Sequence, residues 1–271
     1  MKHSIFILLL SSITVIACAK GKTMNSQLAF IMLNEQSVFN EQKLKDQLID
    51  DWGISFGISN YSEKEKDVTF ELDGITIAVA EMPLPIPPGD LEFPIKTAWY
   101  WENAESDIKN HKYHLVVFCN GDISKKEAAN IITKVATSLL KVENGVGVYW
   151  GSSSQVIQKE LFCGYADMVK TDTNPIPIWI KTTGYKNEDD SFYLYTIGLK
   201  DFSLRELEIE KYKGQWGDGL TFLMEISNYL IENGPIIKDG NTVGSTADEK
   251  IVAQYKKSSL KNDEDVISFI W

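Results

Sequence analysis

The clearest local signal in the chain is VTFELDGITIAV, residues 68–79. Apolar residues alternate with other residues on each side of Asp73-Gly74, and such alternation is typical of a strand with one face in the core. Asp-Gly between two alternating runs is typical of a type I′ hairpin, because both central positions of that turn need a positive φ. The stretch therefore predicts two paired strands and an antiparallel sheet around them.

Apolar patterns and helix-end signals continue from this hairpin in both directions. Strands are predicted at 28–33, 115–119 and 146–150, and a second hairpin is predicted from strands at 176–180 and 193–197 around a turn at 187–190. Three helices are predicted from their ends: one capped by Asn40 and ending at Gly53, one opened by the capping box Ser124–Glu127, and one capped by Asp218 and ending at Asn233-Gly234-Pro235.

Residues 83–94 contain five of the eight prolines of the chain. Proline has no backbone N–H and a fixed φ, so this density is unfavourable inside a helix or a central strand. An extended loop is predicted here, which faces solvent or lines a groove and crosses between two strands.

The order of the elements predicts an α+β fold, with largely antiparallel sheets and helices on one face. Strand, helix, hairpin, helix, strand is followed by helix, strand, hairpin, helix. We therefore expect two pseudo-duplicated halves of the ferredoxin-like, split β-α-β type, at about 27–121 and 122–271. No linker composition separates the halves, so residues 27–271 are predicted to form a single domain.

Composition and charge exclude several classes of protein. The chain has 271 residues with 44% hydrophobic and 24% charged residues, which is an ordinary globular composition. Its 38 acidic and 27 basic residues give a formal charge of −11. Binding to nucleic acid phosphates needs clustered cations, and the sequence has no basic run, so no nucleic acid partner is predicted.

The first residues read as an export signal. Lys2 and His3 precede an uncharged apolar stretch, 4–17, that is too short to span a bilayer. The segment Val15-Ile16-Ala17-Cys18 resembles the bacterial lipobox. That resemblance implies that residues 1–17 are a signal peptide, that Cys18 carries the lipid, and that 18–26 is a short tether to the membrane of the bacterial cell envelope.

Two other interpretations of the leader stay open. The chain can carry a plain cleaved signal peptide with an incidental Cys18, which would release a soluble product. Translation can also begin at Met24, which would give a cytoplasmic protein without the leader.

Candidates for catalysis are few. His111 and His114 are the only histidines after the leader, and spacing of three on a strand places them on opposite faces, so they cannot chelate one metal ion. Cys119 and Cys163 lie in apolar runs and are predicted to be free buried thiols, with a disulfide left open. No catalytic residue, metal or cofactor is predicted.

Aromatic residues give the best candidate for a binding cleft. Trp99-Tyr100-Trp101 follows the proline-rich loop, and Tyr149-Trp150 ends a predicted strand. Tryptophan and tyrosine suit binding because they join a large apolar surface to a polar group. Lys238 and Asp239 stand in a loop rich in turn-forming residues and are expected at the rim. The alternatives are that the rings close the core and that the Lys238 loop is a terminal hairpin.

Several segments together resemble a known family. The resemblance is carried by Met82–Pro87, Thr97–Trp101, Gly147–Trp150 and Gly234–Gly244. They resemble the bacterial family called domain of unknown function 4261, from about residue 27 to the C-terminus. The family has no established activity, so the resemblance implies no catalytic residues. Its members usually begin at the first strand without an export signal, so the leader departs from the family's pattern and the Met24 alternative stays open.

The sequence therefore favours a non-catalytic, lipid-anchored envelope protein that binds an unknown protein or small molecule. The alternative is a cytosolic, immunity-like module that begins near Met24 and binds a basic partner through its acidic surface. A third hypothesis is an enzyme with an unrecognised site.

Overall fold

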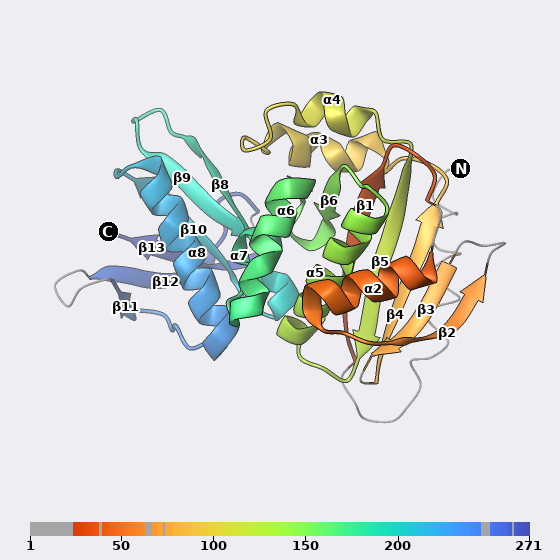
Figure 1. The fold of residues 1–271 in the computed structure, drawn as a ribbon. Helices are drawn as coiled ribbons and strands as arrows, with labels where there is room; N and C mark the ends of the chain where they lie inside the picture. The colour runs from red at the N-terminus through yellow and green to blue at the C-terminus, as the bar shows by residue number, and fades with distance from the viewer. Residues whose placement is uncertain (1–23, 38–39, 63–66, 73, 245–249, 262) are drawn as a thin grey trace.

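The computed structural model of the chain describes residues 24–271 except 38–39, 63–66, 73, 245–249 and 262. Two sheets, with helices packed against them, make up the α+β fold that the sequence predicts (Figure 1). The first sheet consists of β1 (Asn25–Leu33), β2 (Gly57–Ser62), β3 (Asp67–Leu72), β4 (Ile75–Met82), β5 (Tyr113–Gly121), β6 (Gly147–Trp150) and β7 (Gln155–Gln158). Its order is β2-β3-β4-β5-β1-β6-β7, and every pair is antiparallel.

The second sheet has the order β11-β12-β13-β10-β9-β8. It consists of β8 (Lys181–Lys186), β9 (Phe192–Ile197), β10 (Glu206–Tyr212), β11 (Thr242–Val243), β12 (Ile251–Lys257) and β13 (Asp265–Ile270). Its strands pair antiparallel except β10 and β13, which run parallel. A parallel pair needs a long crossover, and α8 with β11 and β12 supplies it.

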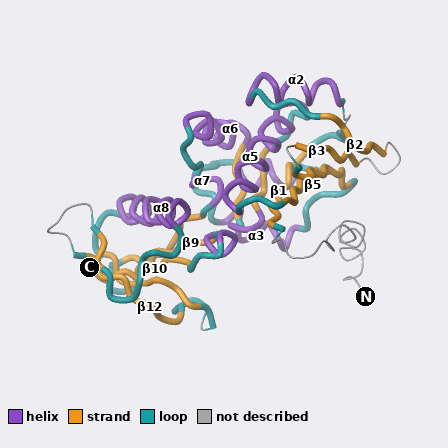
Figure 2. The backbone as a smooth tube through the Cα atoms, turned by 90° about the horizontal axis from the view of Figure 1, so that it is seen from below, coloured by secondary structure: helices purple, strands orange, loops and turns teal. Residues whose placement is uncertain are grey.

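The helices connect and cover these sheets. They are α2 (Glu41–Trp52), α3 (Pro88–Lys96), α4 (Ala104–Lys109), α5 (Lys125–Val142), α6 (Lys159–Ala166), α7 (Ile176–Trp179) and α8 (Trp216–Asn233), with short 3₁₀ turns at Gly151–Ser153, Asp167–Thr171 and Leu199–Phe202. Helix α8 lies along one face of the second sheet (Figure 2). No helix in the described part of the chain is long and apolar enough to cross a membrane.

The hairpin that the sequence predicts most clearly is confirmed. Strands β3 and β4 pair antiparallel from Asp67 opposite Ala80 to Leu72 opposite Ile75. Gly74 has a φ of 81°, which glycine adopts without strain. Asp73, the other turn residue, lies outside the described residues.

Helices α2 and α5 begin as predicted, and α2 and α8 end as predicted, with Gly53 and Gly234 at their C-terminal ends. The Asn40 side chain accepts a hydrogen bond from the Lys43 N–H at 2.9 Å, and Gly53 ends α2 with a φ of 67°. The Ser124 hydroxyl accepts from the Glu127 N–H at 3.1 Å at the start of α5. The prediction that Asp218 caps α8 is wrong, because the helix begins at Trp216 and Asp218 lies in its first turn.

Two predictions of extended structure are wrong for the same reason. Residues 83–94 are not one extended loop, since α3 begins at Pro88. Residues 176–180 are not a strand, since α7 occupies Ile176–Trp179 and β8 begins only at Lys181. Proline at the first positions of a helix loses no hydrogen bond, so Pro88 and Pro177 start these helices rather than preventing them.

The expectation of helices on only one face is also wrong. Ile31 of β1 points into the main core with α2 and α5, while its neighbour Met32 points to the other face. There Met32 packs with Leu91 of α3 and Ile108 of α4 in a second, smaller cluster. The first sheet is therefore covered by helices on both faces.

One core joins the two sheets. The main cluster of buried apolar side chains runs from β1 and α5 through α7 to α8 and β13. The predicted pseudo-duplication is not confirmed: the two sheets differ in strand number and order, and β6 and β7 belong to the first sheet although they follow residue 122.

Candidate ligand-binding site

The predicted aromatic residues are divided between the two faces of the first sheet. Tyr100, Trp101 and Tyr149 belong to the smaller cluster under α3 and α4. The Tyr100 hydroxyl donates to the Val156 carbonyl at 2.7 Å, and the Trp101 indole N–H donates to Asp107 at 2.9 Å. These side chains hold α3 and the following turn on the sheet.

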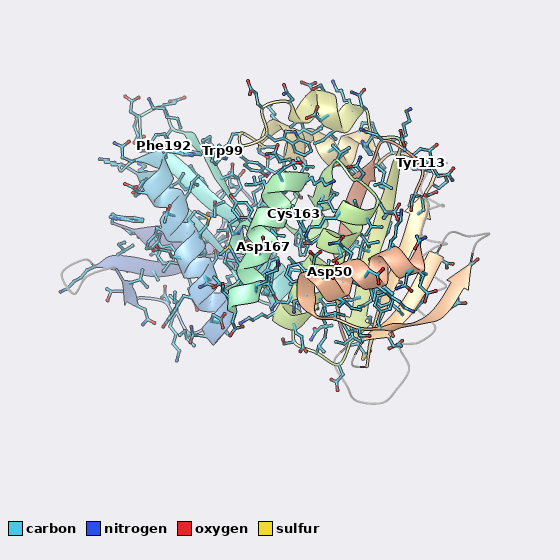
Figure 3. The ribbon with its side chains drawn as sticks, in the orientation of Figure 1. Asp50, Trp99, Tyr113, Cys163, Asp167 and Phe192 are labelled. Atoms are coloured by element: carbon cyan, nitrogen blue, oxygen red, sulfur yellow. The ribbon has the colours of Figure 1, made fainter. Side chains whose placement is uncertain are left out.

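Trp150 lies on the opposite face of the same sheet. It is fully buried in the main core and its ring packs on Phe162 at 6.4 Å between centroids. Trp99, labelled in Figure 3, lies in the turn that follows α3. Its side chain is 73% exposed, and its ring makes a T-shaped contact with that of Tyr100 at 5.6 Å between centroids. The structure therefore does not bring Trp99, Trp101 and Trp150 together into the predicted cleft.

Lys238 and Asp239 lie far along the chain in the turn between α8 and β11. The Lys238 N–H donates to the Asn241 side chain at 2.9 Å, and a carboxylate oxygen of Asp239 accepts from the Tyr255 N–H at 2.8 Å. The first contact is within the turn, and the second holds the turn against β12. Cys18, the predicted lipidation site, lies outside the described residues.

The two histidines hold the proline-rich segment before α3. Nε2 of His111 accepts from the Ile86 N–H at 2.9 Å, and its Nδ1–H donates to the Ile108 carbonyl. His114 Nδ1 donates to the Leu84 carbonyl at 2.9 Å. Burial lowers the pKa of both imidazoles. These hydrogen bonds give both histidines a structural role in holding the segment before α3.

Cys119 and Cys163 are free thiols, as predicted. Cys119 is fully buried in β5, and burial raises its pKa to about 12. Cys163 on α6 is only half-buried, and burial raises its pKa as well. A thiolate is the reactive form, so both raised pKa values argue against nucleophilic use of these cysteines.

Lys181 is a buried cation that the sequence did not reveal. It is 4% exposed, and its ammonium donates to the Thr97 hydroxyl and, at 3.1 Å, to the Ser154 carbonyl. The ring of Phe93 lies 4.9 Å from the ammonium. No carboxylate among the described residues forms an ion pair with it, and burial lowers its pKa to about 8. The side chain joins β8 to α3 and to the turn after β6.

A pocket opens in the second sheet where its parallel strands separate. β10 and β13 pair only from Glu206 opposite Val266 to Glu208 opposite Ser268. Beyond these residues a bulge between Ile209 and Tyr212 shifts the pairing of β10 with β9. A bulge bends its strand and re-aims the side chains near it. Beside the unpaired C-terminal parts of β10 and β13 lies a pocket of about 520 Å³, which Gln254 and Lys256 of β12 also line.

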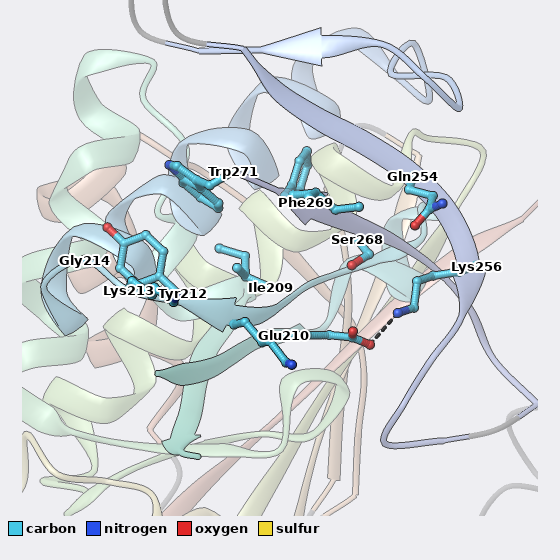
Figure 4. Close-up of a pocket in the computed structure, with 12 residues that line it drawn as sticks. Ile209, Glu210, Tyr212, Lys213, Gly214, Gln254, Lys256, Ser268, Phe269 and Trp271 are labelled. Carbon is cyan, nitrogen blue, oxygen red and sulfur yellow. Dashed lines mark hydrogen bonds and ion pairs between the residues drawn. The ribbon is translucent and has the colours of Figure 1, made fainter. Parts of the chain in front are cut away.

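Polar and aromatic groups line this space (Figure 4). The lining residues are Ile209, Glu210, Lys211, Tyr212, Lys213, Gly214, Gln254, Lys256, Ser268, Phe269, Ile270 and Trp271. The rings of Tyr212 and Trp271 meet edge-on at 5.0 Å and form one end, and the Glu210–Lys256 ion pair stands toward the other. A side chain at Gly214 would clash with the Tyr212 ring, so glycine keeps this end open.

Neighbouring groups determine the charge state of Glu210 at the polar end of the pocket. The hydrogen bond from Lys256, followed by that from the Ser259 hydroxyl, lowers the pKa of Glu210. The carboxylate is therefore ionised and partnered at neutral pH. No sequence motif marks this site, because its walls meet only through the pairing of β10 with β13, a strand about sixty residues later in the chain.

Comparison with known proteins bears on this same part of the chain. A family model matches residues 195–270, which run from β9 to β13 and include the Gly234–Gly244 segment and most of the pocket. The searches of curated proteins and of solved structures gave no match. The matching model is described as Domain of unknown function (DUF4261), and the similarity of this chain to that family extends over residues 195–270.

Proposed function

We propose that the protein is a non-catalytic binding protein whose ligand site is the pocket between β10 and β13. The observation that carries this proposal is the position of the pocket. It lies at the C-terminal ends of two parallel strands, and all of its lining residues except Trp271 fall in the stretch that matches the family model. Ligands of sheets with parallel strands bind characteristically at that end, where the strands part and loops begin.

The pocket also has the composition of a small-molecule site. Its volume falls in the range of about 300–1,000 Å³ that is usual for such sites. Tyr212 and Trp271 supply apolar area, while Gln254 and Ser268 supply hydrogen-bonding groups. A few polar groups among aromatic walls give orientation and specificity without a reaction.

A ligand screen with a blocked pocket tests this function. Gln254 is exposed on β12 and lines the pocket, so Gln254→Trp should fill the space without disturbing the core. Gln42→Trp, on the exposed face of α2, is the matched control. Ligand-observed NMR with a metabolite mixture should give hits that Gln42→Trp keeps and Gln254→Trp loses. Hits that all survive Gln254→Trp would place binding elsewhere.

We also propose that lipid on Cys18 holds this binding protein at the bacterial envelope. The support is the sequence Val15-Ile16-Ala17-Cys18 at the end of the apolar leader. Acyl labelling with and without globomycin, followed by intact-mass measurement, tests the anchor. A labelled product that begins at Cys18 is expected. An unlabelled product that begins at Met24 would support the cytosolic alternative and leave the pocket proposal standing.

A further inference from the structure

The side chains of the pocket carry the opposite charge to the molecule. The whole chain has a formal charge of −11. The pocket is lined by Lys211, Lys213 and Lys256 and by a single acid, Glu210. A cationic site in an acidic protein attracts an anionic ligand electrostatically. It therefore binds that ligand in preference to neutral compounds.

The partners of these lysines show which charge is available. Lys256 is paired with Glu210, and Lys211 lies near Glu210 and Asp189 and contributes to lowering the pKa of both carboxylates. Lys213 is exposed and has no ion-pair partner among the residues that the structure describes. Lys213 is therefore the cation that a ligand can take as its own partner.

The position of Lys213 adds an apolar requirement. It follows Tyr212 directly, at the end of the pocket where the Tyr212 and Trp271 rings meet (Figure 4). Trp271 also contacts Phe222 of α8 at 5.0 Å, which holds its ring in place although the residue is 53% exposed. A ligand whose anionic group pairs with Lys213 would place the rest of its structure against the rings of Tyr212 and Trp271.

We infer that the ligand is an organic anion with a flat apolar body: a carboxylate, sulfonate or phosphate carried on an aromatic group. The anion pairs with Lys213, and the body lies against Tyr212 and Trp271. The backbone of the separated strands offers further hydrogen bonds. This inference rests on the proposed function, because it names the ligand class of the same pocket.

Two dyes that differ only in the anion test the inference. The probe is 1-anilinonaphthalene-8-sulfonate, and its neutral partner is N-phenyl-1-naphthylamine, which has the same rings without the sulfonate. We expect saturable binding of the sulfonate with one site per chain, at least about tenfold tighter than the neutral dye, or about 1.4 kcal/mol. Binding should weaken as salt is raised, because the contact is partly exposed.

Variants separate the charge from the pocket. Lys213→Glu should weaken sulfonate binding at least about tenfold and leave the neutral dye unchanged, while Lys213→Arg should keep it. Lys186→Glu, at the exposed end of β8, is the matched control and should bind as the unmodified chain does. Trp271→Ala should weaken both dyes. Circular dichroism and melting show that each variant is folded.

The outcomes distinguish the two proposals. Equal binding of both dyes, lost in Gln254→Trp but unaffected by Lys213→Glu, would overturn the anion inference and keep the pocket. Binding of either dye that Gln254→Trp leaves intact, or no saturable binding, would count against the pocket itself. An equal loss in Lys186→Glu and Lys213→Glu would assign the effect to overall charge and reject the specific contact.

Discussion

Lys181 has an environment unusual for its residue type. Lysine is rarely buried unless a carboxylate pairs with it. Here the ammonium has two neutral oxygen acceptors and the face of Phe93, and burial lowers its pKa to about 8. The chain therefore keeps a charge where an apolar side chain would be more stable. The side chain fixes α3 and the turn after β6 against β8.

Replacing this charge should stabilise the fold. A pKa of about 8 against the usual 10.5 corresponds to about 3 kcal/mol of unfavourable burial at pH 7, partly offset by lost hydrogen bonds. We expect Lys181→Met to raise the free energy of unfolding by about 1–2 kcal/mol in urea titrations. Lys257→Met, whose side chain is 60% exposed, should change it by less than about 0.5 kcal/mol.

The pH dependence fixes the sign of this effect. The unfolded chain holds the Lys181 proton up to about pH 10.5, whereas the folded chain releases it from about pH 8. The stability of the unmodified chain should therefore rise between these values, and the advantage of Lys181→Met should shrink. A loss of more than about 1 kcal/mol in Lys181→Met at pH 7 would contradict this account.

His111 provides a second test of pH dependence, in which the stability of the fold changes in acid instead of in base. Its Nε2 accepts a hydrogen bond from the Ile86 N–H, so protonation would set two donors against each other, and burial already lowers its pKa. His111→Phe should cost about 1–3 kcal/mol at pH 7.5, because Ile86 N–H and the Ile108 carbonyl lose their partner.

The cost of His111→Phe should decrease as pH falls. A lowered pKa means that the folded state binds fewer protons than the unfolded state. The contribution of the imidazole is thus fully present above about pH 6.5 and is lost as pH falls below it. Unfolding measured at several pH values should show the two chains converging toward pH 5. A constant difference would mean that the titration of His111 is not involved.

At the scale of elements, the helices and strands that the sequence predicts well have a signal at both ends. Helix α2 has Asn40 and Gly53, and the β3–β4 hairpin has its Asp-Gly turn. The strand predicted at residues 176–180 is wrong because alternating isoleucines fit a strand as well as a short helix, and only Pro177 favours a helix start. Local signals predict an element correctly when they agree with one another. They fail when the same apolar pattern is compatible with both a helix and a strand.

The candidate site was beyond such local reasoning. Tyr149 and Trp150 are neighbours in β6, and strand alternation places their rings on opposite faces of the sheet, so only Tyr149 lies in the cluster that contains Trp101. The pocket lies where the pairing of β10 with β13 ends, next to a bulge in the pairing of β10 with β9. Neither long-range pairing nor bulge position has a signal in a single sequence.

Two glycines test the element assignments. Gly74 has a positive φ, so Gly74→Ala should destabilise the hairpin by about 1–2 kcal/mol. Gly89 lies in the first turn of α3 with open space around it. Gly89→Ala should therefore raise the free energy of unfolding by about 0.5 kcal/mol. Thermal and urea unfolding measure both changes. A loss in Gly89→Ala would favour the extended loop over the helix.

At the scale of the whole molecule, α7 connects the two sheets. The Trp179 indole N–H donates to Thr133 of α5 at 2.9 Å, and its ring packs on Phe202 at 5.6 Å between centroids. Ile178 beside it is fully buried in the same cluster. The two sheets thus share one apolar interior instead of meeting across a polar interface.

A shared interior predicts a single cooperative transition. Far-UV circular dichroism, near-UV circular dichroism and tryptophan fluorescence should give the same midpoint in urea. Ile178→Ala should lower that midpoint for all three signals together and cost about 2–4 kcal/mol. Separate midpoints, or a shift of one signal alone, would show that the sheets unfold independently.

Because the hydrogen-bonded pairing of β10 with β13 ends before the strands do, ligand occupancy of the pocket can be measured before any ligand is identified. Amides on the inner edge of β10 beyond Glu208 have no strand opposite them, so they should exchange with deuterium within seconds in the empty protein. A ligand bound in the pocket would slow the exchange of these amides. Mass spectrometry of peptides from this strand, on protein isolated from its native cells, would then reveal whether it arrives already loaded.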